Sequence, residues 1–165
     1  MARLGMGEGL RPFMLANLLS HTLLGCVDGE FLISGIVGRY DPDKRVLHLV
    51  NAGHPAPRLV RDGLVEVVRG EGHPPIGSVR THRYTEAALE LRSGDQVLFF
   101  SDGFSEATNS RGEELGEREL QRVAEVYAEG GPAAIRNALQ ALVLEHTGDL
   151  SAVDDDLTLL ILSVA

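Results

Sequence analysis

Two apolar segments of this chain are each bounded by aspartate, and this arrangement constrains the fold more than any other feature. The segment Gln96–Phe100 is followed directly by Ser101-Asp102-Gly103, and the triplet Asp154-Asp155-Asp156 precedes the segment Leu157–Leu162. Short apolar runs bounded by polar turn residues are typical of buried β-strands. The pattern therefore predicts two strands of a buried sheet with carboxylates at its rim.

Carboxylates from these two segments could share a hard cation, because Mg²⁺ and Mn²⁺ prefer oxygen ligands. The alternative is that each aspartate is a turn residue, since Asp is favoured where strands begin and end. The three adjacent acids of residues 154–156 favour a cation, because neighbouring carboxylates repel one another and a bound cation offsets that repulsion. The residues alone leave both interpretations open.

Length and charge restrict the class of protein. The 165 residues suit a single domain with one sizeable core, and 44% hydrophobic and 24% charged residues are typical of a soluble globular protein. The net charge of −9 argues against a nucleic-acid partner held by phosphate contacts. It is compatible with cation binding and with a basic or neutral protein partner.

A cytoplasmic location is expected from three observations. The N-terminus carries no signal-peptide pattern, and no apolar stretch approaches the roughly 20 residues needed to span a membrane. The single cysteine, Cys26, cannot form an internal disulfide, which favours a reducing setting. Its apolar neighbours indicate a packed side chain rather than a nucleophile.

The periodicity of apolar residues predicts an α+β protein with antiparallel strands. Helices are predicted over Phe13–Leu24, Glu117–Ala128 and Pro132–His146. Strands are predicted over Phe31–Tyr40, Val46–Val50, Arg58–Val60, Leu64–Val68, Tyr84–Leu91, Gln96–Phe100 and Leu157–Val164. Turn residues at Asp41-Pro42-Asp43 and Asp62-Gly63 predict two hairpins.

A histidine follows one of these strands in the segment Asn51-Ala52-Gly53-His54-Pro55. Asn and Gly tolerate a left-handed backbone, so the segment predicts a sharp turn. His54 could bind substrate, donate a proton or lie near a metal, or it could simply be satisfied by local backbone. The loop Gly72–Gly77 indicates either a rigid cover over a cleft or a surface connection.

Several motifs occur in a fixed order that resembles a known family. They are Asn51–Pro55, Pro74–Gly77, Ser93–Asp95, Leu98–Ala107, Gly112–Gly116 and Asp155–Leu160. The series resembles bacterial serine/threonine phosphatases of the stage II sporulation protein E type, within the metal-dependent, type 2C-like superfamily. The match runs from about Pro12 to the C-terminus. Each motif alone is weak, whereas the whole series is highly specific.

The resemblance implies a four-layer α-β-β-α sandwich of two antiparallel sheets flanked by helices, with residues 1–165 as a single phosphatase-like domain. It implies a binuclear Mn²⁺ or Mg²⁺ centre whose bridging water attacks phosphoserine or phosphothreonine. The implied substrate is a phosphorylated regulatory protein, such as an anti-sigma-factor antagonist, in sporulation or stress-response signalling.

The resemblance also assigns residues to the site. Asp102 and the adjoining Gly103 match the family's metal-binding Asp-Gly motif, and Asp155 matches the first aspartate of its Asp-Asp-x-Thr motif. Asp154 is an adjacent extra acid that competes for the same assignment. His54 falls where animal and plant relatives place a further acidic residue near the metals, and it is expected to assist catalysis.

The first part of the chain departs from the family pattern. It lacks the Gly-Asp-containing strand and the Asp-Val-Ser-Gly-type motif that supply the family's other metal-binding carboxylates. The early acids Glu8, Asp28 and Glu30 have no matching context. The sequence therefore predicts an N-terminally truncated family domain or a divergent member with an incomplete metal site. Exposed sheet edges would then favour a partner or a homodimer, and the alternative function is a catalytically incomplete module that binds a protein in signalling.

Overall fold

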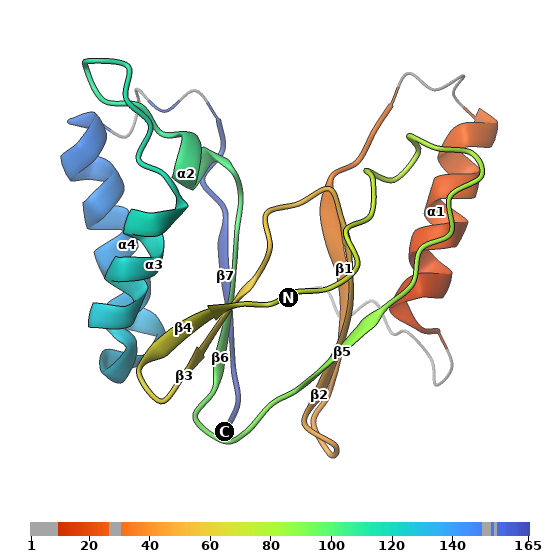
Figure 1. Ribbon diagram of the computed structural model, residues 1–165, viewed down its shortest axis with the longest axis horizontal. Coiled ribbons are helices and arrows are strands. Elements are labelled where there is room, and N and C mark those ends of the chain that lie inside the picture. Colours follow the sequence, from red (N-terminus) through yellow and green to blue (C-terminus); the bar gives the residue numbers. More distant parts are fainter. Residues whose placement is uncertain (1–9, 27–30, 150–152, 154) are drawn as a thin grey trace. The chain divides into compact units, whose positions relative to one another are not determined.

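The computed structural model describes residues 10–26, 31–149, 153 and 155–165 (Figure 1). The chain divides into two compact units, Met1–His54 with Arg69–Leu91, and Pro55–Val68 with Arg92–Ala165. Each unit contains one antiparallel sheet and its own helix or helices, which confirms the predicted α+β class. The expectation that the whole chain is one phosphatase-like domain stays a prediction. No helix in the described ranges has the length and apolar character that a membrane span requires.

The first unit consists of one helix and three strands, α1 (Pro12–Cys26), β1 (Gly35–Asp41), β2 (Val46–Ala52) and β5 (Ala87–Glu90). The strand order is β1-β2-β5. The strands β1 and β2 form the predicted hairpin, in a register from Gly35 opposite Ala52 to Asp41 opposite Val46. Helix α1 begins one residue before the predicted Phe13, at Pro12, because the fixed φ of proline suits a first helical turn.

The core of the first unit lies between α1 and the sheet. Ala16 of α1 is fully buried against Val50 and Ala52 of β2, together with Ile76 and Tyr84 from the segment before β5. A small residue at this point of α1 allows the helix to approach the strands closely. The side chain of Cys26, for which packing was predicted, lies outside the described residues, as do Glu8, Asp28 and Glu30.

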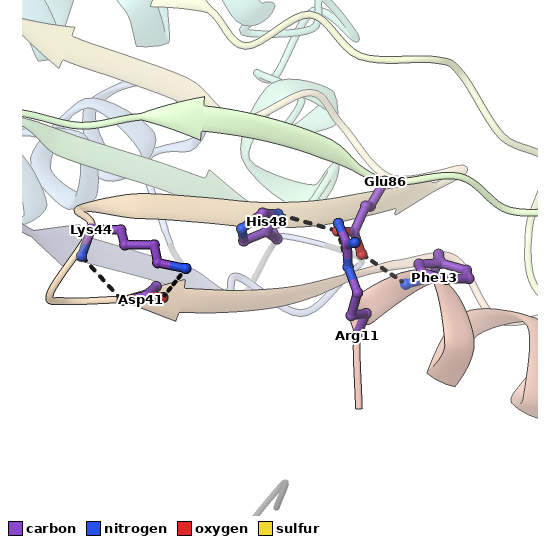
Figure 2. Close-up of polar contacts among 6 residues, drawn as sticks. All are labelled: Arg11, Phe13, Asp41, Lys44, His48 and Glu86. Carbon is purple, nitrogen blue, oxygen red and sulfur yellow. Dashed lines mark hydrogen bonds and ion pairs between the residues drawn. The ribbon is translucent and has the colours of Figure 1, made fainter. Parts of the chain in front are cut away.

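Glu86 joins the start of α1 to the sheet (Figure 2). Its Oε1 accepts a hydrogen bond from Nε of Arg11 at 2.8 Å, and its Oε2 accepts one from the backbone N–H of Phe13 at 3.4 Å. Nδ1 of His48 on β2 lies 3.1 Å from Oε1. Because this part of the chain binds the helix, the strand predicted over Tyr84–Leu91 is wrong in extent, and β5 forms only its second half.

The second unit contains four strands and several helices. They are β3 (Arg58–Arg61), β4 (Leu64–Val67), β6 (Gln96–Phe100), α2 (Gly103–Glu106), α3 (Glu117–Val126), the short 3₁₀ helix η1 (Ala128–Gly130), α4 (Gly131–Thr147) and β7 (Leu159–Ser163). The strand order is β4-β3-β6-β7, with antiparallel neighbours throughout. The predicted hairpin of β3 and β4 is confirmed, and β6 has the predicted bounds.

Helices α3 and α4 cover one face of this sheet (Figure 1). In α4, Ile135, Leu139 and Val143 are at most 2% exposed, and they recur every four residues along one helix face. They pack in one cluster with Leu98 and Phe100 of β6. The most deeply buried strand of the chain thus lies directly before the Asp-Gly motif.

Other predicted boundaries also differ from the structure. The last strand, β7, is shorter than the predicted Leu157–Val164, and two further differences have a clear cause. The strand predicted from Phe31 begins at Gly35, because the β1–β2 register ends there and only Ile33 bridges onward, to Ile76. The helix predicted to extend to Ala128 ends at Val126, where a turn leads into η1. In both cases the run of apolar residues extends beyond the residues that form the regular hydrogen bonds of the strand or helix.

Candidate active site

The first half of the candidate site lies where the chain leaves β6. The backbone carbonyl of Asp102 accepts hydrogen bonds from the N–H groups of Ser105 at 2.8 Å and Glu106 at 2.9 Å. The carboxylate of Asp102 makes no capping hydrogen bond to α2, and the residue is exposed. The backbone carbonyl of Asp102 therefore stabilises the turn. The carboxylate takes no part in these hydrogen bonds, so the turn alone does not explain why the side chain is an aspartate.

The second half of the site is the segment before β7, which lies against the first half. Ser101 joins the two: its Oγ donates to the carbonyl of Asp156 at 2.7 Å and accepts from the N–H of Thr158 at 3.0 Å. Its backbone N–H donates to the carbonyl of Thr158 at 3.0 Å. The pairing of β6 with β7 thus brings together the two aspartate segments that the sequence placed at strand ends.

Gly103 lets these segments approach closely. A Cβ built on this residue would lie 3.0 Å from the carbonyl oxygen of Asp156 and 3.5 Å from Cβ of Asp155. A side chain here would force the segments apart. Asp155 itself is exposed, and its Oδ1 accepts the N–H of Asp156 at 2.8 Å. Gly103 has no side-chain donor, so any metal contact from it would use the backbone carbonyl.

The oxygen donors of this site suit a hard cation in kind. Asp102 and Asp155 supply carboxylates, the donor class that Mn²⁺ and Mg²⁺ prefer. Within the described part of the chain, however, no three or more His, Cys, Asp or Glu side chains are grouped to hold a metal ion. Asp154, the competing acid, lies outside the described residues. Two carboxylates are fewer protein ligands than a tight site uses.

His54 lies in the first unit, in the turn that follows β2, whereas both aspartates belong to the second unit. The side chain of Asn51 brackets this turn: Oδ1 accepts from the N–H of His54 at 2.9 Å, and Nδ2 donates to its carbonyl at 2.8 Å. Gly53 adopts a φ of +72°, as expected of a sharp turn. The structure thus confirms the turn, while the assisting role of His54 stays a prediction.

Sequence reasoning missed two residues that shape the second unit. Ser101 joins the aspartate segments by hydrogen bonds. The only sequence feature that could have indicated this role is a hydroxyl residue between the end of a strand and the Asp-Gly pair. Arg58 begins β3 with a side chain that is 4% exposed, donates to Oε2 of Glu117 at 2.7 Å and lies over the ring of Phe100. Its signal is a charge at the start of an apolar strand.

Ser101→Ala is expected to lower the free energy of unfolding by about 1–2 kcal/mol, because two hydrogen bonds across the site are lost. The same change should weaken Mn²⁺ binding, since the aspartate segments are no longer held together. Chemical denaturation and a metal titration measure the two effects. Ser105→Ala is the matched control, because that hydroxyl bonds only locally, to the carbonyl of Asp102. Equal effects of the two changes would contradict a bridging role.

The family described as Stage II sporulation protein E (SpoIIE) matches residues 1–165. The fold is similar to the SiaA PP2C domain of Pseudomonas aeruginosa, with a TM-score of 0.77, 19% identity, and coverage of 93% of this chain and 60% of that one. No curated protein sequence matches significantly.

Two further solved structures share the fold. The RsbU and RsbW domains of a Mycobacterium tuberculosis protein match with a TM-score of 0.74 and 23% identity, over 93% of this chain and 42% of that one. The phosphatase domain of SpoIIE from Bacillus subtilis matches with a TM-score of 0.61 and 17% identity, over 79% and 56%. The chain thus spans less than two thirds of each of these three solved structures. By its match to the family over all 165 residues, the chain belongs to the stage II sporulation protein E family.

Proposed function

We propose that this chain acts as a metal-dependent serine/threonine phosphoprotein phosphatase that uses Mn²⁺ or Mg²⁺. One structural observation supports this function most directly: the exposed aspartates Asp102 and Asp155 lie on two segments that Ser101 and Gly103 hold together at the end of β6. Family membership indicates the class of reaction, and the paired carboxylate segments provide oxygen donors for the ion that such a reaction uses.

In this proposal each residue has a separate task. Bound cations would activate a water nucleophile and neutralise charge on the phosphoryl oxygens. Asp102 and Asp155 would supply carboxylate ligands to those cations. Ser101 is a positioning residue that holds the two segments together, and Gly103 permits their close packing. His54 would hydrogen-bond the substrate or transfer a proton, the roles for which a neutral imidazole is suited.

The proposed substrate is a phosphorylated regulatory protein, such as an anti-sigma-factor antagonist, in the cytoplasm. The solved Mycobacterium tuberculosis structure contains an RsbU and an RsbW domain, which supports a regulatory protein as partner. The net charge of −9 favours a binding surface on that partner that is basic or neutral. It also opposes binding to nucleic acid.

A second candidate is a phosphatase-like module that binds a protein partner without catalysis. The observation that favours it is the small ligand set, since the described ranges hold no group of three or more metal-binding side chains. Strand β7 ends the sheet order of the second unit, and Leu160 on it is 57% exposed. An edge strand of this kind suits pairing with a partner or with a second copy of the chain.

Metal binding and phosphate release together distinguish the two functions. We expect calorimetry to show weak Mn²⁺ binding, with a Kd on the order of 10⁻⁴ M or weaker, because few carboxylates contribute. We expect slow release of phosphate from a phosphoserine peptide, which requires Mn²⁺ and stops when EDTA is added. No release at any Mn²⁺ concentration would reject catalysis by this chain and favour the binding module. Tight binding of two Mn²⁺ ions would show that further residues complete the site.

A further inference from the structure

Two histidines of the first unit form a pair that the proposed reaction does not use. His73, in the loop before β5, is 8% exposed, and its Nδ1 lies 3.0 Å from Nε2 of His82. Its other ring nitrogen, Nε2, lies 3.0 Å from the carbonyl oxygen of Thr85. The two imidazoles meet edge to face with centroids 5.1 Å apart, and the buried ring of Tyr84 packs against both.

The bond between the two rings needs a single hydrogen between the facing nitrogens, Nδ1 of His73 and Nε2 of His82. Nε2 of His73 lies 3.0 Å from the carbonyl oxygen of Thr85 and 3.4 Å from its backbone nitrogen, so both neutral tautomers of His73 fit its contacts. In either tautomer the neutral pair has one hydrogen between the facing nitrogens. When both rings are protonated, both facing nitrogens carry hydrogen and both rings are positive, so the bond is lost.

The pair holds a loop against the turn that carries His54. His73 forms a parallel bridge with Ala52 at the end of β2. The hydroxyl of Tyr84 donates to the carbonyl of Pro75 at 3.0 Å. Pro75 in turn packs on Gly53, where a Cβ would lie 2.8 Å from its Cγ. The loop is therefore attached to the end of β2 and its turn through Pro75 and through the bridge between His73 and Ala52.

We propose that His73 and His82 form a pH-sensitive latch, which holds the loop Gly72–Gly77 against the Gly53–His54 turn near neutral pH and releases it on acidification. This inference does not depend on phosphatase activity. It assigns a role to the Gly-Pro-rich loop, which the sequence left open between a rigid cover and a surface connection.

The charges around the pair favour release in acid. Burial, and to a smaller extent the charge of His73, lower the pKa of His82 below its ordinary value. A group with a lowered pKa in the folded state takes up protons more readily once released, so the latch is intact above about pH 6.5 and weakens as the pH falls below that value. Arg80 and Arg83 are exposed on the same segment and add positive charge. The neighbouring carboxylate is Glu71, which accepts a hydrogen bond from the hydroxyl of Thr85.

Hydrogen exchange of the full chain at pH 7.5 and pH 5.0 tests the latch. After correction for the intrinsic exchange rate, we expect protection of amides in Gly72–Gly77 to fall about fivefold or more at pH 5.0, the effect of one lost hydrogen bond. His82→Gln retains a donor but does not titrate, so this variant should keep its protection. The matched control is His21→Gln, an exposed histidine of α1, which should respond to pH as the unaltered chain does.

Three outcomes would overturn the latch. The first is an equal loss of protection in His82→Gln at pH 5.0. The second is a pKa of His82 that is not lowered from the ordinary histidine value. NMR titration of the unaltered chain measures it and does not depend on the folding of any variant. The third is thermal stabilisation by Zn²⁺ that disappears in His82→Gln, because that result would identify a metal site instead.

Discussion

Asp102→Ala is expected to lower Mn²⁺-dependent phosphate release by this chain at least about 100-fold. The proposed site contains few carboxylates, so the loss of one removes a large share of the ligands. Removal of a residue that only hydrogen-bonds to a metal ligand typically lowers metal affinity or activity by roughly 10- to 100-fold. Removal of a ligand itself should cost at least as much. Phosphate release from a phosphoserine peptide, measured over a range of Mn²⁺ concentrations, separates a loss of metal affinity from a loss of maximal rate.

Asp43→Ala is the matched control for Asp102→Ala. Asp43 is exposed in the turn between β1 and β2, and its replacement changes the net charge of the chain by the same amount. We expect this variant to retain the activity of the unaltered chain. Asp155→Ala should resemble Asp102→Ala. Robust turnover that neither Asp102→Ala nor Asp155→Ala reduces would show that the reaction takes place on other residues.

Asp95→Ala is expected to lower the free energy of unfolding by about 3 kcal/mol. Asp95 ends the turn that precedes β6 and is 3% exposed. Its carboxylate accepts hydrogen bonds from Nε of Arg61 at 3.0 Å and from the backbone N–H of Arg92 at 2.7 Å. Removing one partner of a buried ion pair leaves the other uncompensated, and such changes typically cost about 3–5 kcal/mol. The lower end applies because Arg61 is 26% exposed. Urea denaturation at pH 7 measures the effect.

The effect of Asp95 should depend on pH in a defined direction. Burial raises the pKa of Asp95, but the hydrogen bonds from Arg61 and Arg92 and their positive charges outweigh burial, so the pKa lies below its ordinary value. A lowered pKa means that the unfolded chain binds the proton more readily. The stabilisation is therefore fully present above about pH 4 and is lost as the pH falls through the folded pKa.

Glu114→Ala serves as the control for this pH dependence, since Glu114 is an exposed carboxylate of the same unit. We expect Glu114→Ala to change the free energy of unfolding by less than about 0.5 kcal/mol at pH 7. The stability of Asp95→Ala should approach that of the unaltered chain only in acid. A constant difference between them from pH 7 to pH 3 would contradict the ion-pair explanation.

Predictions from the sequence were most accurate where a segment is buried and bounded by turn residues. Strand β6 has the predicted bounds, Gln96–Phe100, because the residues between two polar turns pair on both sides, with β3 and β7. Helix α4 follows from the period of Ile135, Leu139 and Val143. The strand prediction fails where an apolar residue packs elsewhere. Tyr84 was predicted to begin the strand that contains β5, but its ring packs on two histidines.

The candidate site was only partly predictable for a related reason. The sequence indicated that Asp102 and Asp155 stand at strand ends, because both follow or precede an apolar run. Ser101, which bridges their segments, has no local pattern of its own, and the sequence indicated Gly103 only through its match to the Asp-Gly motif, not through the close packing it permits. The histidine pair has no signal in the sequence, since its members are nine positions apart and neither forms part of a periodic element.

The sequence by itself determined the α+β class, the two hairpins and the placement of the aspartates next to two paired strands. Of these strands β6 is buried as predicted, whereas β7 lies at the sheet edge and is only partly buried. These features depend on the order of apolar and turn residues within short segments, which is a local property of the chain. Only the tertiary structure decided which segments lie together. Ser101 and Thr158 are 57 positions apart and meet because β6 pairs with β7. Such contacts arise from burying whole faces of helices and sheets, and no short segment carries that information.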